Sequence, residues 1–332
     1  MPAVMSRRRF ITFVAAAAGL PLLLKAGGAQ ARPVRWDGTA LGAPASIQLF
    51  HSDEARARAA ITAGLDELKR LEAIFSVYRA DSSISKLNRD GVLENAPSDF
   101  TAMLTRALSL AKISDGVYDP TIQPLWQTYF RHFTASTPDP AGPAPRDLAA
   151  ALALVDWRAV EVDAGRNRVS FARPGMGLTL NSGAQGYITD RVTDVLRSHG
   201  FDRMLVDMGE PRALSTKPDG SAWRIGIADP ADPNRTVVTL DVVDKCVSTS
   251  GGYGTLFDSA GAFTHLVNTR TGGTAPALLG VSVVADSGAV ADGLSTAMLM
   301  APVERRQSIL KAAGGLKAIY VTPSGVVSTV EA

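Results

Sequence analysis

The chain has 332 residues, of which 46% are hydrophobic and 20% are charged, as is typical of a folded globular protein. Its formal net charge is +2, but four of its 34 basic residues, Arg7, Arg8, Arg9 and Lys25, lie within the first 31 residues. The rest of the chain has 30 basic and 32 acidic residues, a net charge of −2. This balance excludes a generally basic nucleic-acid-binding protein. The single cysteine, Cys246, excludes an internal disulfide and a cysteine-based zinc site, and its apolar neighbours predict that it is buried.

Residues 1–31 have the three-part plan of a bacterial export signal. Arginines in Ser6-Arg7-Arg8-Arg9-Phe10-Ile11 precede an apolar run at residues 13–24, and Ala29-Gln30-Ala31 is a cleavage site of small residues. The arginine pair indicates the twin-arginine route. Because the apolar run is too short to span a bilayer, we expect no stable membrane anchor. The predicted mature chain is residues 32–332, located in the periplasm.

The first half of the mature chain is predicted to combine a few strands with amphipathic helices. Residues 35–50 read as one or two strands. Residues 53–78 keep one apolar stripe at helical spacing, and Ser98 can cap a second helix that runs to residue 113. Residues 79–88 read as a polar loop, residues 115–121 as a turn, and residues 147–155 as a short helix.

From residue 160 onward, the pattern changes to strands. Apart from one helix that Gly200 ends, we expect strands at residues 204–210, 223–228, 236–243, 263–268 and 280–285. Strands that follow one another without regular helix crossovers favour an α+β fold of mostly antiparallel or mixed sheets flanked by helices. The change of pattern suggests two intimately packed subdomains within residues 32–332, with a boundary near residues 156–160.

Several polar, glycine-containing stretches stand at predicted strand ends, at residues 181–186, 208–210, 249–252 and 270–273. Glycine lets main-chain N–H groups approach a phosphate or the edge of a ring. One such stretch is most often only a turn, whereas four of them favour a site for a large anionic ligand. The usual nucleotide-binding fingerprints G-x-x-x-x-G-K-[ST] and G-x-G-x-x-G after a strand do not occur.

Asp292, Ser295 and Thr296 stand at positions i, i+3 and i+4 of a predicted helix, which places them on one face. A carboxylate and two hydroxyls are oxygen ligands of the kind that Mg²⁺ takes, with water and phosphate completing its coordination. Taken alone, the segment is also consistent with ordinary polar residues at the start of a helix. His265 lies in a predicted strand, where a lone histidine is more often structural than catalytic.

The order of short motifs along the chain resembles the ApbE family, the FAD:protein FMN transferases. The motifs that carry the resemblance span nearly the whole mature chain: residues 75–78 and 83–88, residues 114–121, Ala184-Gln185-Gly186-Tyr187 with Asp190, Gly209-Glu210, Ser248-Thr249-Ser250-Gly251, residues 265–272, and residues 291–296. Within the family, residues 180–187 and 207–210 are similar to the NosX-type branch. That branch is exported and associated with flavinylation of a membrane regulator of nitrous-oxide reduction.

The resemblance implies an activity and a set of site residues. FAD would be the substrate and Mg²⁺ the metal; a threonine of an acceptor flavoprotein would attack the FMN phosphorus, and AMP would leave. By resemblance, the metal would be held by Ser182 through its carbonyl, Asp292, Ser295 and Thr296, with His265 and Asp292 as catalytic residues. The residues expected to contact FAD are Leu41, Tyr78, Val117, Tyr118, Asp119, Gln185, Thr249, Ser250, Gly251 and Val267.

The sequence departs from the family pattern at several of these positions. Many members have aspartate at the position of Thr179, lysine at that of Gln185, and Asp-Pro at that of Asn268-Thr269, while Ser295 is acidic in some. Fewer charges would weaken the binding of Mg²⁺ and of phosphate. Two alternatives to a transferase therefore stay open: a periplasmic flavin-binding or delivery protein, and an FAD pyrophosphatase. The acceptor is expected to present its threonine in a domain that faces the periplasm.

Overall fold

The computed structural model describes residues 33–275 and 279–332. Its α-helices are α1 (Glu54–Phe75), α2 (Ser83–Asp90), α3 (Ser98–Ile113), α4 (Gln123–Phe133), α5 (Pro145–Leu152), α6 (Asn181–Ser198), α7 (Gly288–Met300) and α8 (Arg306–Ala312). Short 3₁₀-helices are η1 (Pro120–Ile122), η2 (Trp157–Ala159), η3 (Gly252–Gly254) and η4 (Val303–Arg305). The predicted export signal and Arg32 lie outside the described residues.

Within the described residues, the strands form three antiparallel sheets. They are β1 (Pro33–Ala40), β2 (Ala43–Phe50), β3 (Val92–Leu93), β4 (Val160–Asp163), β5 (Arg168–Phe171), β6 (Met204–Asp207), β7 (Pro211–Leu214), β8 (Trp223–Asp229), β9 (Asp232–Val242), β10 (Cys246–Gly251), β11 (Gly280–Ala285), β12 (Gly315–Val321) and β13 (Val327–Glu331). The main sheet has the order β1-β2-β6-β7-β10-β11-β12-β13. The smaller sheets are β3-β5-β4 and the β8-β9 hairpin. Separate helices packed on antiparallel sheets confirm the predicted α+β class.

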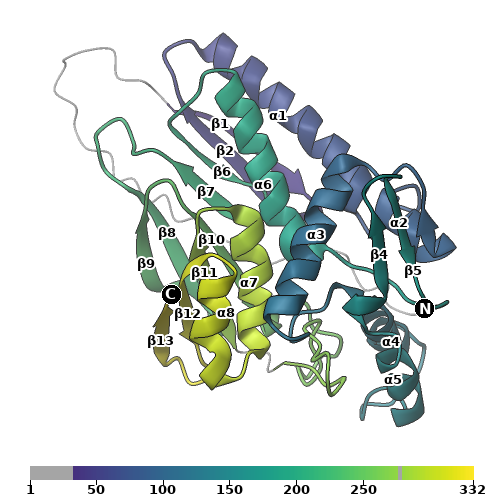
Figure 1. Ribbon diagram of the computed structural model, residues 1–332. Coiled ribbons are helices and arrows are strands. Elements are labelled where there is room, and N and C mark those ends of the chain that lie inside the picture. Colours follow the sequence, from purple (N-terminus) through teal and green to yellow (C-terminus); the bar gives the residue numbers. More distant parts are fainter. Residues whose placement is uncertain (1–32, 276–278) are drawn as a thin grey trace.

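Helices α1, α6, α7 and α8 lie across one face of the main sheet (Figure 1). Successive side chains of β10 point to opposite faces of the main sheet. Cys246 packs among the side chains of α7 and β11, whereas the next residue, Val247, packs with Trp223 and Ile225 of the β8–β9 hairpin. Cys246 is fully buried, as predicted. The face of β10 that carries Cys246 therefore points toward α7.

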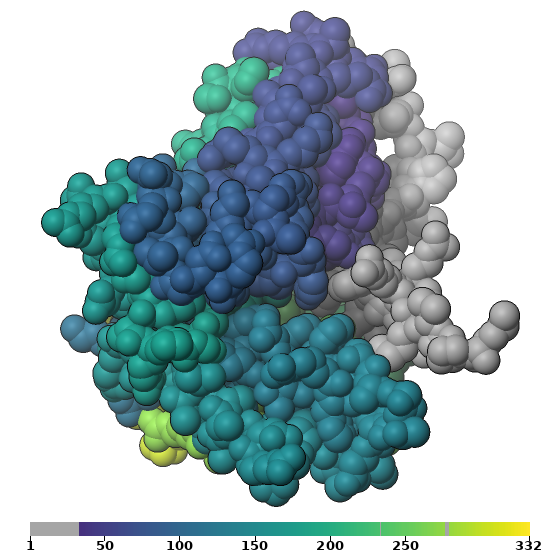
Figure 2. Space-filling model, turned by 90° about the vertical axis from the view of Figure 1, so that its right-hand side faces the viewer, coloured from purple at the N-terminus to yellow at the C-terminus, as the bar shows by residue number. Residues whose placement is uncertain are grey.

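The segment with α4 and α5 lies at the side of this layered structure, below α2 and α3 in Figure 1. Figure 2 shows the same side of the molecule, with the blue residues of the first helices above the teal segment that carries α4 and α5. Leu125 and Tyr129 of α4 pack against Phe257 and Val267, which come from the loop between β10 and β11. This aromatic packing holds that loop, which includes His265, beside the helices of the first half of the chain.

Two predictions of local structure were wrong. Residues 83–90 form α2 and not a polar loop, because Ser82 caps the helix, with its Oγ accepting from Ser85 N at 3.2 Å, while Ile84 and Leu87 are buried. Residues 263–268 form no strand: they make only the isolated bridges Leu256↔Thr264 and Val267↔Thr274, because their backbone groups bond within the loop. The glycine-containing stretch at residues 249–252 does stand at a strand end, as predicted, since β10 ends at Gly251.

Other boundaries shift by a few residues. Helix α1 ends at Phe75, three residues before the predicted end, and α3 begins with Ser98 as its first helical residue and not as its cap. The suggested subdomain boundary at residues 156–160 falls on η2 and the first residue of β4, and it stays a prediction.

None of the helices in residues 33–275 and 279–332 has the length and apolar character needed to cross a membrane.

Candidate functional site

Helix α7 is buried along most of its length, although it carries several polar residues. Asp292 is 3% exposed and Ser295 is fully buried, whereas Thr296 is half-buried. The apolar residues Leu294, Ala297 and Met298 seat the helix in the core, as the sequence predicts. Because buried polar groups cost free energy unless they are hydrogen-bonded, the partners of Asp292, Ser295 and Thr296 decide what this helix face can do.

Asp292 faces a kink in α6. Ser182 (φ −82°, ψ 90°) and Gly183 (φ 128°) leave helical geometry, so the helix starts again after them. Asp292 Oδ2 accepts a 3.0 Å hydrogen bond from the N–H of Gly186, at the start of the restarted helix. The carbonyl of Ser182 accepts a 2.9 Å hydrogen bond from the hydroxyl of Tyr118. The kink thus places a main-chain carbonyl and a buried carboxylate beside the same turn.

The two hydroxyls of α7 face β10 instead. Ser250 Oγ lies 2.7 Å from Ser295 Oγ and 2.9 Å from Thr296 Oγ1, and Ser248 Oγ lies 3.4 Å from Ser295 Oγ. Ser295 also donates to the carbonyl of Asp292 at 2.8 Å. Ser248 and Ser250 reach α7 because they share the face of β10 that carries Cys246. Three of the four predicted metal ligands therefore lie on α7, and the fourth, the Ser182 carbonyl, lies at the kink of α6 that Asp292 faces.

A second buried carboxylate, Glu210, stands next to this region. It is 9% exposed, and its Oε2 accepts a 3.3 Å hydrogen bond from Thr249 N. Burial, together with the charge of Asp292, raises the pKa of Glu210 well above its usual range. Burial likewise raises the pKa of Asp292 to about 7, although hydrogen bonds from the α6 amides oppose this. Gly209-Glu210 is one of the motifs that carry the family resemblance, but the resemblance implies no role for Glu210.

No lysine or arginine pairs with Asp292 or Glu210 within the described residues. The structure therefore places two carboxylates in a buried region without a side-chain cation beside them. The oxygen-only donor set of Asp292, Ser295, Thr296 and the Ser182 carbonyl fits a hard divalent cation such as Mg²⁺. In the part of the chain that the structure describes, no group of three or more histidine, cysteine or acidic side chains could hold a metal, so hydroxyl and carbonyl oxygens would have to contribute.

His265 lies in the loop between β10 and β11. Its Nδ1 is 3.2 Å from both the N–H and the carbonyl oxygen of Thr255, and Gly254 approaches the ring so closely that a Cβ there would lie 3.0 Å from Cε1. Burial lowers the pKa of His265 below its ordinary value of 6.5. The contacts made through Nδ1 orient the ring, and in the tautomer in which Nδ1 donates to the Thr255 carbonyl, Nε2 is the nitrogen that could accept a proton.

The residues predicted to contact FAD occupy several elements. Leu41 forms the β1–β2 turn with a positive φ of 47°, and its N–H donates to Glu72 Oε1 at 2.7 Å. Tyr78, just after α1, is 72% exposed. Gln185 packs against Gly209, where a Cβ would lie 2.4 Å from Nε2. This close approach requires glycine at position 209, whose φ is 107°.

Val117, Tyr118 and Asp119 belong to a loop between α3 and η1. The Asp119 carboxylate accepts from Thr121 N and Trp157 N at 2.8 and 3.0 Å, so it already caps two local turns. Thr269 Oγ1 donates to the Gly116 carbonyl at 2.6 Å, and this bond joins the His265 loop to the Tyr118 loop. Ser250 and Tyr118 thus touch predicted metal-binding groups directly, whereas Val267 packs in the aromatic cluster around α4.

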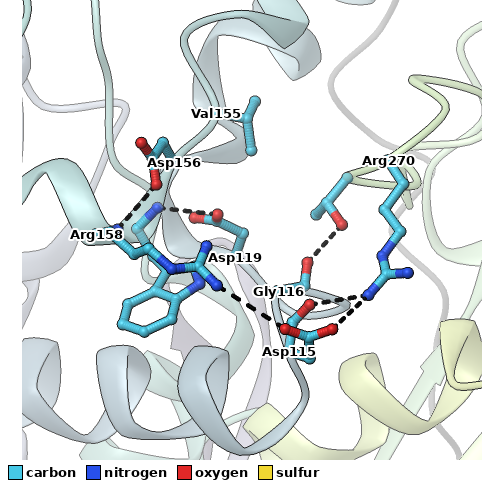
Figure 3. A pocket seen from close by; sticks show the side chains of 9 residues that line it. Asp115, Gly116, Asp119, Val155, Asp156, Arg158 and Arg270 are labelled. Atoms are coloured by element: carbon cyan, nitrogen blue, oxygen red, sulfur yellow. Dashed lines mark hydrogen bonds and ion pairs between the residues drawn. The ribbon is translucent and has the colours of Figure 1, made fainter.

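A cleft of about 250 Å³ is lined by Asp119, by residues 155–158, and by Thr269 and Arg270 of the His265 loop (Figure 3). Arg270 binds Asp115 Oδ2 at 2.9 Å across its mouth, and Arg158 lies 3.8 Å from the same carboxylate. Trp157 and Asp119 complete the wall. Of the predicted site residues, Asp119 alone lines this cleft, and no predicted metal ligand does.

Comparison with known proteins identifies the family of this chain. Residues 41–320 match the ApbE family, and the chain belongs to that family. A protein of Treponema pallidum named FAD:protein FMN transferase is 30% identical over 294 residues, which cover 81% of this chain and 79% of that protein. One of Klebsiella pneumoniae with the same name is 29% identical, covering 85% and 87%. The family resemblance seen in the sequence is thereby confirmed.

Solved structures agree with this assignment. The apo form of the flavinyl transferase ApbE of Pseudomonas stutzeri is 27% identical, has a TM-score of 0.77, and is matched over 91% of this chain and 95% of that one. The ApbE protein of Thermotoga maritima has a TM-score of 0.78 at 23% identity, over 90% and 97% of the two chains. The second likeness supports the fold alone, and both agree with the α+β class.

Proposed function

We propose that this chain is an FAD:protein FMN transferase that depends on Mg²⁺. The observation that carries the proposal is the arrangement of Asp292, Ser295 and Thr296 on α7. Asp292 faces the kink of α6 that carries the Ser182 carbonyl, and the hydroxyls of Ser295 and Thr296 contact the hydroxyl of Ser250. The names of the relatives, which cover most of this chain, support the same activity. The departures at Thr179, Gln185 and Asn268 remove family charges but leave these oxygen ligands in place.

The reaction replaces the phosphoanhydride bond of FAD with a phosphoester bond to the acceptor. The hydroxyl oxygen of an acceptor threonine forms a bond with the FMN phosphorus of FAD, and the bond from that phosphorus to the bridging oxygen breaks. AMP leaves with the bridging oxygen, and the threonine proton goes to a base. Catalysis of this type comes mainly from positioning and from neutralising the phosphate charge. Buried, pre-oriented groups such as those around α7 suit both tasks.

Asp292, Ser295, Thr296 and the Ser182 carbonyl would hold Mg²⁺. When bound there, the ion would neutralise the charge of the FAD pyrophosphate. Tyr118 keeps the Ser182 carbonyl in position, and Ser250 does the same for the two hydroxyls. His265 is suited to accept the threonine proton, because its lowered pKa leaves the ring neutral at pH 7.

The acceptor and the location of the reaction are further parts of the proposal. The twin-arginine signal in residues 1–31 supports export to the periplasm, where a flavoprotein domain would present its threonine. The similarity to the NosX-type branch suggests the flavoprotein regulator of nitrous-oxide reduction as that acceptor. The binding of FAD would involve Leu41, Tyr78 and the loop at Val117 to Asp119.

The decisive experiment combines the mature protein with FAD, Mg²⁺ and a candidate acceptor domain, and follows AMP by chromatography and the acceptor by intact mass. We expect AMP release together with an acceptor heavier by one FMN residue, and both should disappear with EDTA. Free FMN and AMP without acceptor would instead identify a pyrophosphatase. FAD that is bound but unchanged with every acceptor tested would identify a flavin carrier and contradict the transferase.

A further inference from the structure

We propose that Asp190 is a positioning residue that fixes the start of α7 and thereby the placement of Asp292, Ser295 and Thr296. This inference rests on the proposed function, since it concerns the metal-binding role of those three residues. Asp190 lies on α6, and its side chain reaches the first turn of α7. Asp190 belongs to one of the motifs that carry the family resemblance, but the resemblance implies no role for Asp190.

The first observation is the way in which α7 is capped. Ser287 occupies the N-cap position, yet its own side chain makes no capping hydrogen bond. Instead, Asp190 accepts from Gly288 N at 2.9 Å and from Ala289 N at 3.2 Å. Asp190 Oδ2 also accepts from the Ser287 hydroxyl at 2.7 Å. A carboxylate on a different helix therefore satisfies N–H groups that the local cap residue leaves open.

The second observation is that the carboxylate is itself held firmly. It pairs with Arg212 of β7, and the side chains of Asp190 and Arg212 are 16% and 18% exposed. Cys246 Sγ lies 3.8 Å from Asp190 Oδ1. Because a charge-assisted bond at a partly buried site is stronger than one at the surface, Asp190 has little freedom to follow movements of α7.

The third observation is that α6 carries the other half of the candidate metal site. Gly186 and Gly288 touch so closely that a Cβ on Gly186 would lie 2.1 Å from the Gly288 carbonyl oxygen. Gly186 N also binds Asp292, and Ser182 lies one turn earlier. Asp190 thus sets the position of α7 relative to the helix that supplies the Ser182 carbonyl. A small shift of α7 would separate Asp292 from that carbonyl.

The test compares Asp190→Ala and Asp190→Asn with a control, Asp229→Asn. Asp229 is also a buried carboxylate paired with an arginine, Arg235, but its contacts lie within the β8–β9 hairpin. Three quantities are measured on the mature enzyme: the Mg²⁺ concentration for half-maximal AMP release, amide hydrogen exchange of the peptide covering residues 286–296, and the melting temperature.

We expect Asp190→Ala to raise the required Mg²⁺ concentration about tenfold or more, the scale seen when a group that orients metal ligands is lost. Exchange at residues 286–296 should become faster. Asp190→Asn keeps one acceptor oxygen for the α7 amides and should fall between Asp190→Ala and the wild type; it also serves as the reporter if Asp190→Ala does not fold. Asp229→Asn should lower the melting temperature without changing the Mg²⁺ requirement.

Faster exchange with an unchanged Mg²⁺ requirement would show that Asp190 only stabilises the helix, and would overturn the positioning role while leaving the transferase intact. An equal change in Mg²⁺ requirement for Asp229→Asn would also overturn it, because the effect would then reflect stability. A wild-type enzyme that releases AMP equally well with and without Mg²⁺ would refute the metal site itself, and this outcome is recognised from the wild-type titration alone.

Discussion

The hydroxyl of Tyr118 donates a 2.9 Å hydrogen bond to the main-chain carbonyl of Ser182. This bond connects the loop after α3 to the kink in α6, across 64 residues of sequence. Because Ser182 and Gly183 are not helical, the carbonyl points away from the helix ladder and needs another partner. Tyr118 therefore holds in place one of the four groups proposed to bind Mg²⁺.

Replacing Tyr118 by phenylalanine should lower the free energy of unfolding by about 1 kcal/mol, the net contribution of one such hydrogen bond. It should also raise the Mg²⁺ concentration needed for AMP release, because the Ser182 carbonyl loses its fixed direction. Thermal unfolding and a Mg²⁺ titration of AMP release measure the two effects. The matched control is Tyr129→Phe, which removes a buried 2.7 Å bond to the Gly272 carbonyl. If both variants changed the Mg²⁺ requirement equally, the role of Tyr118 would be structural only.

Asp292→Asn should reduce AMP release at least ~100-fold, the scale of losing one group that stabilises charge in the transition state. The substituted amide can still accept from Gly186 N, so the protein without metal should fold with a melting temperature no lower than that of the wild type. Steady-state AMP release and thermal unfolding test this. Asp286→Asn is the control, because Asp286 is an exposed carboxylate just before α7. Full activity of Asp292→Asn would refute the proposed metal site.

The raised pKa of Asp292 predicts how stability depends on pH. Its folded-state pKa of about 7 exceeds the ordinary value of 3.8, so the metal-free protein loses the corresponding stability as the pH rises through 7. Below pH 7 the proton competes with the metal for the carboxylate. The rise in melting temperature on adding Mg²⁺ should therefore be larger at pH 8 than at pH 6. Thermal scans at pH 6, 7 and 8 measure it, and an equal rise at all three would contradict the assignment.

His265→Ala should slow FMN transfer by a factor of about 10² to 10⁴, the usual contribution of a general base, while weakening FAD binding much less. Protonation of His265 should slow the wild-type reaction at low pH. Because the pKa of His265 is lowered, this fall in rate should lie below pH 6.5. Single-turnover rates and FAD titrations separate the two effects. His132→Ala is the control, since the His132 ring contacts the Asp139 carbonyl, at 2.9 Å, and Phe133, and is not among the predicted site residues. Equal losses in rate and in FAD affinity would make His265 a binding residue.

The double substitution Arg7→Lys and Arg8→Lys should block export, because the twin-arginine route depends on the guanidinium groups of the pair. Cell fractionation followed by immunoblotting would measure the periplasmic and cytoplasmic amounts of the protein. Replacing Lys25 by arginine offers a control that alters a basic residue outside the pair. Normal periplasmic accumulation of the double variant would argue for a different route.

The sequence was a good guide where the structure depends on local periodicity. The apolar stripe of α1 and the i, i+3, i+4 spacing on α7 both predicted helices that the structure contains. It was a poor guide where a short element depends on its cap or on distant contacts. Helix α2 has eight residues of mostly polar character, so its two buried side chains were too weak a signal. The segment around His265 has strand-like residues but packs against α4.

By itself, the sequence determined the chemical groups of the candidate site, their spacing on α7, and the family to which the chain belongs. Helical spacing is encoded within four residues, so it can be recognised without knowledge of the fold. Only the tertiary structure decided that Asp292 meets Gly186, that Ser250 meets Thr296, and that Asp190 caps α7. The residues that meet in these three contacts are separated in the sequence by 106 positions, 46 positions and 97 to 99 positions, respectively. These contacts arise from the packing of α6 and β10 against α7, which no local pattern specifies.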